Sequence, residues 1–562
     1  MDVPKSEKKL LQFAQDTIQI CNYSQGSRAQ DAASNLAYYE VGADDGTESL
    51  YNRTGIHIDR TSSYLYAPGE IRYSIGFDAT TGDSWLARAK AASKYLSREY
   101  RRADGDVAFA QGVQIGLIKG CSILKHNWMD PESLSPGLDP FLVHPEFFGV
   151  EREDLARLED QQAMVHTTYL SKEQVTQMVR GRQDEADVLK SLAKLGASDD
   201  TQGRLNWLHQ IVIGGSQPVT TDGSATSRSQ VSMTPSSKTQ FSPDMMENLL
   251  RMDELWVVDE DRDDYTTIQL IEGLVLLEGK YRHRNLTGVK GMHPFSKICA
   301  DPVAGYFWGR SEVSRVKMLQ DFLSERVNDI RRLLKMQLKP AKGMIGFSGI
   351  TAQKMRAALT PGGFLQEQNP NAKMQDLITQ IPKEAFSEIA SIVEMFDEIG
   401  GFKPITQGQG EPGVRAGSHA RTLMRTASPK LRERALRIER DAETSAHITF
   451  KLMQAKEARV FLGAKEDGGP GEHFLLAQMP EDYYVEIDSH SSSPAFIDDA
   501  RELAFALAKV GAAGPEEVIM MTHPPGEEQL LAAVRRRQAA RAKMIQDHPE
   551  LLTGGKGKGK AA

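Results

Sequence analysis

Residues 304–340 read AGYFWGRSEVSRVKMLQDFLSERVNDIRRLLKMQLKP, an aromatic and glycine-rich lead-in followed by a long amphipathic segment. From Val313 onward, apolar residues recur every three or four positions, which places them on one stripe of an α-helix. These residues are Val316, Leu319, Leu323, Val327, Ile330 and Leu334. Ser311 is a suitable N-cap, Glu312 favours the positive end of the helix dipole, and Pro340 ends the hydrogen-bond ladder. The pattern predicts a helix of about 28 residues, roughly 40 Å long, either a structural strut or the core helix of an enzyme.

Composition places the chain among ordinary globular proteins. It has 562 residues, 40% of them hydrophobic and 26% charged, which is typical of a soluble protein with about two to four domains. No run approaches the roughly 18 apolar residues of a membrane span, and no apolar signal region follows the N-terminal charges. Cys21, Cys121 and Cys299 lie far apart without CxxC spacing, which argues against disulfides or structural zinc. We therefore expect neither secretion by a signal peptide nor membrane contact, and a reducing cytoplasm fits.

The charge balance limits how the protein contacts nucleic acid. Lysine and arginine total 68 against 76 acidic residues, a formal net charge of −8. Such a chain does not grip DNA over its whole surface, so any DNA contact is local or slippery. The exception is the lysine- and glycine-rich end, 547–562, which we interpret as a disordered basic tail, with a nucleic-acid arm as the alternative.

The first 80 residues mix a charged helix, from Lys5 to about Tyr23, with polar stretches such as VGADDGTES. We interpret residues 1–80 as an adaptable N-terminal arm whose order depends on a partner.

Helices and strands alternate in the next part of the chain. Periodicity predicts helices over Ser84–Arg102 and Val107–Lys119, and Ser171 caps a further short helix. Apolar stretches predict strands at Cys121–Trp128, Phe141–Val150, Met164–Tyr169, Leu255–Val258, Thr266–Ile271 and Leu274–Leu277. The fold class is therefore α+β and predominantly helical.

A polar insert interrupts this part between Gly214 and Asp244, where serine, threonine, glycine, glutamine and proline dominate. It buries too little to offset its entropy, so we expect a long exposed loop. The acidic run Asp259–Asp264 is expected at a hairpin turn. It lacks the glycine and final glutamate of an EF-hand, so a solvated turn explains it better than a calcium site.

After Pro340 the pattern becomes helical again. A compact α/β piece over Ala341–Gln380 precedes a helix over Glu384–Ile399, a glycine-rich loop and a long helix from about Ser418 to Phe461 that Pro429 kinks. Leu431, Ala435, Ile438, Ala442 and Ala446 form one stripe of the second piece of this helix. The predicted remainder is a strand at Tyr483–Ile487 and helices at Asp498–Val510, Pro515–Met520 and Glu527–Gln546.

Motifs for catalysis are weak. Gly408, Gly410 and Gly413 match G-x-G-x-x-G by letter, but no strand precedes them and Pro412 interrupts them. The sequence contains no P-loop, no HExxH and no GxSxG, and we interpret His283, His293, His447 and His473 as surface or interface residues. We expect no enzyme activity, no cofactor and no metal.

With these elements in order, the chain resembles the portal proteins of tailed bacteriophages, also called head-to-tail connectors, and is closest to the short-tailed-phage type. The most specific match is Pro294, Phe295, Gly305, Gly309 and Arg310 with the helix that follows, which resembles the start of the family's stem. GLIKG with the following apolar strand resembles the wing helix and strand. The likeness covers about residues 84–490 in element order, and the polar insert departs from it.

The resemblance implies a dodecameric ring at one capsid vertex, a channel for genome packaging and ejection. Its partners would be further copies of itself, double-stranded DNA, the terminase motor, major capsid and scaffolding proteins, and tail adaptors. It would reside in the virion, and in the host cytoplasm during assembly. By position it implies a wing (81–308), a stem helix (309–340), a clip (341–382), a second stem helix (383–400), a channel loop (401–417), a wing helix and strand (418–490) and crown helices (491–546).

The predicted channel loop combines residues that allow backbone movement with basic residues at its exit. Its glycines and Pro412 allow the backbone to change conformation with little strain. Arg415, His419, Arg421 and Arg425 at its exit are candidate contacts to DNA phosphates, or alternatively partners of acidic residues at a subunit interface. Two other functions stay open: a soluble enzyme of unknown chemistry on a helical scaffold, and another ring-forming phage protein such as a tail adaptor.

Overall fold

The computed structural model describes most of the chain. The described ranges are 1–43, 51–66, 72–77, 83–129, 137–194, 249–277, 284–338, 341–345, 373–377, 384–401, 429–462, 472–480, 482–487, 503–522, 530–531 and 533–538, with single positions at 68, 353, 371 and 540. Helices and sheets both contribute, so the fold is α+β, as predicted. No described helix is long and apolar enough to cross a membrane.

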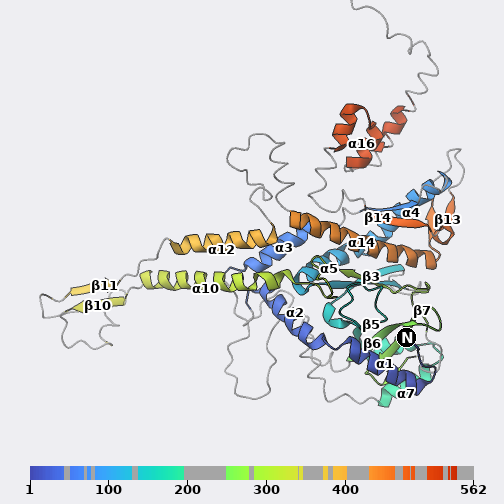
Figure 1. Cartoon of the computed structure of the whole chain (residues 1–562), viewed down its shortest axis with the longest axis horizontal. Coiled ribbons are helices and arrows are strands. Elements are labelled where there is room, and N and C mark those ends of the chain that lie inside the picture. Colours follow the sequence, from blue (N-terminus) through green and yellow to red (C-terminus); the bar gives the residue numbers. More distant parts are fainter. Residues whose placement is uncertain are drawn as a thin grey trace, which may run out of the picture.

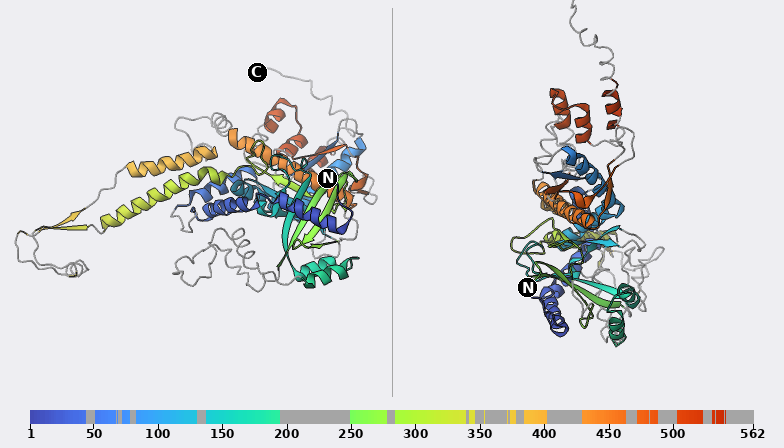
Figure 2. Two further views of the ribbon diagram at one scale, coloured as in Figure 1. Left: turned by 60° about the horizontal axis from the view of Figure 1, so that its bottom comes forward. Right: turned by 90° about the vertical axis from the view of Figure 1, so that its right-hand side faces the viewer.

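The molecule consists of a broad body and a long projection (Figures 1 and 2). Helices α10 (Glu312–Leu338) and α12 (Glu384–Gly400) leave the body side by side, and the hairpin of β10 (Ala341–Ile345) and β11 (Lys373–Leu377) lies at their far end. We call α10 and α12 the helical pair. Both helices begin and end close to the predicted positions.

The N-terminal residues are part of the body, which corrects the prediction of an adaptable arm. Helix α1 (Glu7–Cys21) packs Leu10 and Ala14 against the largest sheet. Helices α2 (Gln25–Glu40) and α3 (Arg53–Leu65) pack against the main core and the helical pair. The sequence pattern was misread because polar side chains such as Asn35 and Thr54 are buried here and form part of the packed interior.

Helices α4 (Asp83–Arg102) and α5 (Gly105–Lys119) confirm the prediction for this region. Helix α4 packs on strand β1 (Tyr73–Phe77), which pairs antiparallel with β14 (Tyr483–Ile487). A strand from near the start of the chain is therefore joined to one from near its end.

A three-stranded sheet lies beside α5, with β2 (Ser122–Met129) between β3 (Gly137–Val143) and β9 (Phe295–Ile298). The predicted single strand Phe141–Val150 is two strands, because Pro145 starts a 3-10 turn, Pro145–Phe147. The chain then changes sheets, and β4 (Phe148–Val150) pairs with β5.

The five-stranded sheet has the order β4-β5-β6-β7-β8, with β5 (Ala163–Ser171), β6 (Leu249–Asp259), β7 (Asp264–Ile271) and β8 (Val275–Leu276). The acidic run forms the β6–β7 turn, as predicted, with Asp263 in the left-handed region at φ 51°. Helix α6 (Lys172–Val179) begins with a capping box of Ser171 and Gln174, and α7 (Glu185–Lys194) packs beside it. The polar insert 214–244 lies outside the described residues.

Helix α14 (Pro429–Ala455) crosses the body, and its predicted stripe, Leu431 to Ala446, is buried. It ends earlier than predicted: Glu457 takes a left-handed conformation and the next residues form β12 (Arg459–Phe461), paired with β13 (His473–Leu475). A 3-10 turn, Leu476–Gln478, follows β13. Residues 503–510 are helical, as is α16 (Pro515–Thr522), whereas most of the predicted helix 527–546 lies outside the described residues.

Candidate functional site: the helical pair and its buried root

The two helices of the pair hold each other through one small apolar cluster. Val316 and Leu323 of α10 pack against Ile392 and Phe396 of α12, and all four are buried. The predicted stripe residues Leu319 and Val327 lie partly buried against this cluster, and Ile330 is also buried. The pair is therefore a narrow two-helix unit whose rigidity depends on few side chains.

Leu334, the last residue of the predicted stripe, is 44% exposed. The Nε atom of Arg326 lies 3.0 Å from Oε1 of Glu388, so these two residues are level in the antiparallel pair. Leu334 lies about 12 Å beyond Arg326, whereas α12 starts only about 6 Å beyond Glu388. Described residues of α12 therefore do not reach Leu334, which is exposed in the single chain.

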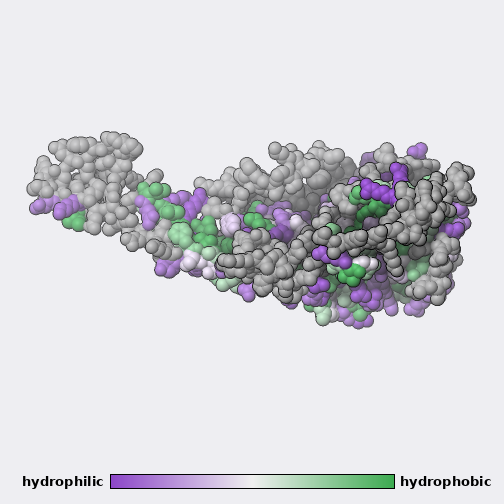
Figure 3. All heavy atoms as spheres, turned by 90° about the horizontal axis from the view of Figure 1, so that it is seen from above, coloured by the Kyte–Doolittle hydropathy of each residue, from purple (hydrophilic) through white to green (hydrophobic). Residues whose placement is uncertain are grey.

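The helical pair also carries apolar side chains that its own chain leaves exposed. On the face seen in Figure 3, hydrophobic residues (green) lie on the projection between the body and the tip. The exposed apolar side chains of the pair are Met318, Phe322, Leu334, Met336, Leu338, Phe386 and Met395, with exposed fractions between 42% and 82%. Large exposed apolar side chains gathered on one element mark a contact surface.

Helix α3 lies at the root of the pair, where α10 begins and α12 ends. Gln320 of α10 is fully buried, and its Oε1 accepts hydrogen bonds from the backbone nitrogens of Arg53 at 3.0 Å and Thr54 at 3.1 Å. The side chain of Asn52 caps the same helix end by accepting from the Gly55 nitrogen at 2.9 Å. A side chain of α10 thus satisfies the free backbone donors at the start of α3.

Ion pairs hold α12 to the root. Asp397, near the end of α12, lies 2.8 Å from Nη2 of Arg53 and 3.3 Å from Nη1 of Arg60. Because both arginines belong to α3, this helix is tied to α10 by hydrogen bonds and to α12 by ion pairs.

Glu312, the first residue of α10, is the centre of a buried ionic cluster. It is 1% exposed, and its carboxylate lies 2.5 Å from Nη2 of Arg434 on α14, 3.3 Å from Nε2 of His57 on α3 and 3.6 Å from Nη1 of Arg315. These hydrogen bonds and charges outweigh desolvation and lower the pKa of Glu312 to about 2. Asp301 pairs with both Arg315 and Arg434. The cluster joins α3, α10 and α14 at one point.

Ser311 caps α10 as predicted. Its Oγ accepts from the Ser314 nitrogen at 3.3 Å and donates to the Ile118 carbonyl of α5 at 2.6 Å. Sequence reasoning found this cap but missed Glu312, His57, Gln320 and Arg434 as a group. The only signal was a set of polar residues at core positions of the helical stripes, which a single sequence does not distinguish from surface positions.

The predicted DNA-contact residues lie outside the described residues: Gly408, Gly410, Gly413, Arg415, His419, Arg421 and Arg425. Of the predicted channel loop, only Gly401 is described, with φ 78° directly after α12. The described ends of this segment are Gly401 and Pro429, and Lys430 Nζ donates to the Ile399 carbonyl at 2.6 Å. The chain therefore leaves the described part at Gly401 and re-enters it at Pro429, both at the root of the pair.

A histidine and hydroxyl network lies in the core between β2, β9 and α14. His126 Nε2 lies 3.0 Å from Ser296 Oγ and 3.3 Å from Ser445 Oγ, and its Nδ1 lies 3.0 Å from Thr449 Oγ1. Burial lowers the pKa of His126 to about 3. All four side chains are buried, so the network holds elements together and presents no nucleophile to a substrate.

A second buried network joins the two sheets. Lys125 Nζ of β2 donates to Glu254 Oε1 of β6 at 2.6 Å, and Trp256 Nε1 donates to the same oxygen at 2.7 Å. Lys125 also faces the ring of Phe295, which stacks on His293. His293 is buried within the chain, which corrects its expected position at the surface or an interface; the rings of Phe295 and Tyr265 cover it.

Asp441 of α14 makes the stability of the body depend on pH. Its Oδ2 accepts from the Cys299 nitrogen at 2.8 Å, while burial raises its pKa to about 7 despite nearby Lys297, Arg437 and Arg440. A raised folded pKa stabilises the folded state when the group is protonated, and this contribution is lost as pH rises through about 7. Relative to Asp441→Asn, the wild type should therefore melt at a progressively lower temperature as the pH rises from about 4 to about 7, and the difference should stay constant above about pH 8. Parallel melting temperatures for the two proteins would contradict this assignment.

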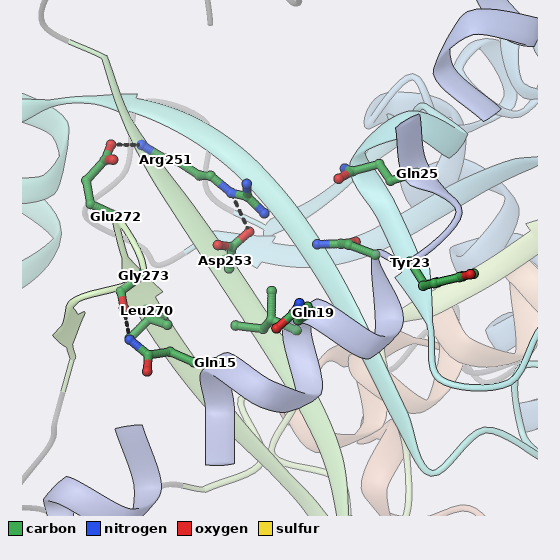
Figure 4. Close-up of a pocket in the computed structure, with 11 residues that line it drawn as sticks. Gln15, Gln19, Tyr23, Gln25, Arg251, Asp253, Leu270, Glu272 and Gly273 are labelled. Atoms are coloured by element: carbon green, nitrogen blue, oxygen red, sulfur yellow. Dashed lines mark hydrogen bonds and ion pairs between the residues drawn. The ribbon is translucent and has the colours of Figure 1, made fainter. Parts of the chain in front are cut away.

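A pocket of about 600 Å³ lies between α1 and the ends of β6 and β7 (Figure 4). Its polar groups pair with one another: Arg251 Nε with Asp253 at 3.0 Å, the Arg251 nitrogen with Glu272 at 2.6 Å, and Gln15 Nε2 with the Gly273 carbonyl at 2.6 Å. The bond from Gln15 joins α1 to the sheet, and the other two lie within the sheet side of the pocket. The pocket is therefore a weaker functional candidate than the helical pair.

Together these features define an α+β protein with a projecting pair of antiparallel helices anchored in buried charges. No group of three or more metal-ligating side chains occurs among the residues that the structure describes. The three cysteines are free and buried. No protein-family model matches the chain, and no curated protein matches it.

Proposed function

We propose that the chain is the subunit of a phage portal ring. In this proposal about twelve copies surround a channel at one capsid vertex, through which the genome is packaged and later ejected. The terminase motor and then the tail adaptors bind one end, capsid and scaffolding proteins surround the ring, and another chain supplies ATP hydrolysis. The site of action is the virion, with assembly in the host cytoplasm.

The observation that carries the proposal is the helical pair with its hairpin. Two long antiparallel helices project from an α+β body, and a small β-hairpin closes their far end. The resemblance noted from the sequence assigns these elements to stem and clip. The exposed apolar side chains of the pair add support, because a subunit packed between two neighbours covers such a surface.

The first test is negative-stain electron microscopy of the purified full-length protein, with native mass as a companion. Rings of near twelve-fold symmetry with a central channel are expected. Monomers or dimers at every concentration, with and without capsid proteins, would refute the proposal and favour the soluble-enzyme alternative. A ring that binds tails but never terminase would favour a tail adaptor.

Phe322→Glu is expected to abolish ring assembly with little change in the stability of the subunit. Phe322 is 48% exposed on α10, so the new carboxylate is solvated in the single chain but becomes an unpaired charge when a neighbour covers it. The measurements are native mass for assembly and melting temperature for stability. Glu325→Gln on the same helix is the control and should still assemble. Full assembly of Phe322→Glu would show that this side chain does not lie in the interface.

Replacing residues 402–417 by a short glycine and serine linker is expected to preserve rings but impair DNA handling. The described residues that flank this part of the chain, Gly401 and Pro429, both lie at the root of the pair, so a short flexible linker can replace residues 402–417. Packaging efficiency and retention of DNA in filled capsids are the measurements. Unchanged values for both would exclude this segment as a DNA contact.

A further inference from the structure

Helix α4 carries a line of positive charge along its exposed side. Lys90, Lys94, Arg98 and Arg101 are all exposed. At 3.6 residues per turn they fall within an arc of about 80° and extend over about 17 Å. We call these four residues the basic stripe. The only acidic residues of the helix are Asp83 and Glu99.

The packing of α4 fixes the direction of the stripe. The opposite side of the helix is buried in the main core through Ala89, Ala92, Leu96 and Tyr100, each at most 2% exposed. Tyr100 is further held by a hydrogen bond between its hydroxyl group and Ser445 Oγ at 3.1 Å. The helix cannot rotate without opening the core, so the cations stay directed to solvent.

The stripe contrasts with the chain as a whole. The protein has a formal net charge of −8, so a concentrated line of cations is not explained by a basic surface in general. Arg98 and Arg102 pair with Glu99 at 3.0 Å and 2.8 Å yet remain largely exposed. The exposed cations of this helix therefore outnumber its acidic residues in a chain that is acidic overall.

The aromatic residues beside the stripe favour a duplex over a single strand. The Arg98 guanidinium lies 5.5 Å from the centre of the Tyr95 ring, and that of Arg88 lies 4.6 Å from the Trp85 ring. Sites for single strands leave aromatic faces open so that bases stack on them. Here arginines occupy those faces, and what remains accessible is charge suited to a phosphate backbone.

We propose that the basic stripe of α4 binds the phosphate backbone of double-stranded DNA, independently of base sequence. The choice of partner rests on the proposed portal function, but this site is separate from the predicted channel loop. Helix α4 lies at the end of the body opposite the β10–β11 hairpin (Figures 1 and 2). The DNA contacted there is therefore at the end of the subunit away from the proposed clip.

The test is binding of a labelled 30-base-pair duplex to the full-length protein, measured by fluorescence anisotropy over a range of salt concentrations. The variant is Lys90→Gln/Lys94→Gln/Arg101→Gln, which keeps Arg98 and Arg102 with Glu99. The matched control, Lys172→Gln/Arg180→Gln/Lys190→Gln, removes the same charge from exposed positions on or beside α6 and α7. We expect the α4 variant to bind the duplex at least about tenfold more weakly. The slope of log K against log salt concentration should decrease by an amount that corresponds to up to about three phosphate contacts. The control should remain within about twofold of wild type.

A labelled poly-glutamate peptide serves as a second ligand in the same assay. Three outcomes would overturn the site: the wild type does not bind the duplex, both variants lose duplex affinity equally, or the α4 variant loses affinity for the peptide but not for the duplex. The last result would identify an acidic protein segment as the partner. Electron microscopy of the same samples separates this test from that of the portal proposal. Rings with unchanged DNA binding reject only the stripe, whereas stripe-dependent binding without rings rejects only the portal.

Discussion

Arg434→Met is expected to lower the free energy of unfolding by about 3–5 kcal/mol, because it leaves a buried carboxylate without its closest cation. Glu312 and Arg434 are 1% and 3% exposed and lie 2.5 Å apart. The remaining neighbours of Glu312 are farther away, His57 at 3.3 Å and Arg315 at 3.6 Å. The measurements are the urea midpoint and the melting temperature.

The double variant Glu312→Gln/Arg434→Met should recover much of this loss, since removing both charges removes the unpaired one. Arg437→Met is a matched control on α14: Arg437 is half-exposed and pairs with Glu433, so its loss should cost at most about 1 kcal/mol. Equal effects at Arg434 and Arg437 would show that the cluster contributes little.

The cluster also predicts a pH dependence. The folded pKa of Glu312 is about 2, below its ordinary value of 4.5. The contribution of Glu312 to stability is therefore fully present above about pH 4.5 and is lost as the pH falls through 2. The difference between wild type and Arg434→Met should shrink as the pH is lowered from 6 toward 3. A constant difference would place the effect in packing instead of charge.

Phe396→Ala is expected to cost about 3–5 kcal/mol and to separate the helical pair. Phe396 is fully buried and belongs to the small cluster with Val316, Leu323 and Ile392. Its ring also meets His57 of α3 edge-on at 6.2 Å. Because so few side chains join α12 to α10, the cavity is not compensated by a larger core.

The effect should be local, so hydrogen exchange of the 384–400 amides is the most direct measurement. Phe386→Ala is the control on the same helix, because Phe386 is 54% exposed and its truncation should change stability by at most about 0.5 kcal/mol. Loss of protection in both variants, or in neither, would contradict the packing described for the pair. Ring assembly should fail in Phe396→Ala if the rigid pair is the assembling unit.

Hydrophobic spacing and capping residues were enough to predict the two helices of the pair as separate elements. The stripe from Val316 to Ile330, the cap at Ser311 and the start of α12 at Glu384 follow from local chemistry, and the structure has them where expected. The stripe of α14 is similar, since Leu431 to Ala446 are buried. Such periodicity is a property of short segments, so it can be read without knowing what they pack against.

Other features depended on partners distant in the chain. The pairing of β1 with β14, the change of sheet after Pro145 and the place of α1 to α3 in the body are long-range contacts with no local pattern. The root cluster is the clearest case, since His57, Glu312 and Arg434 meet only after α3, α10 and α14 have packed. A charged residue is buried only when tertiary structure supplies its partner, so the sequence determined the helices and the tertiary structure decided which charges hold them together.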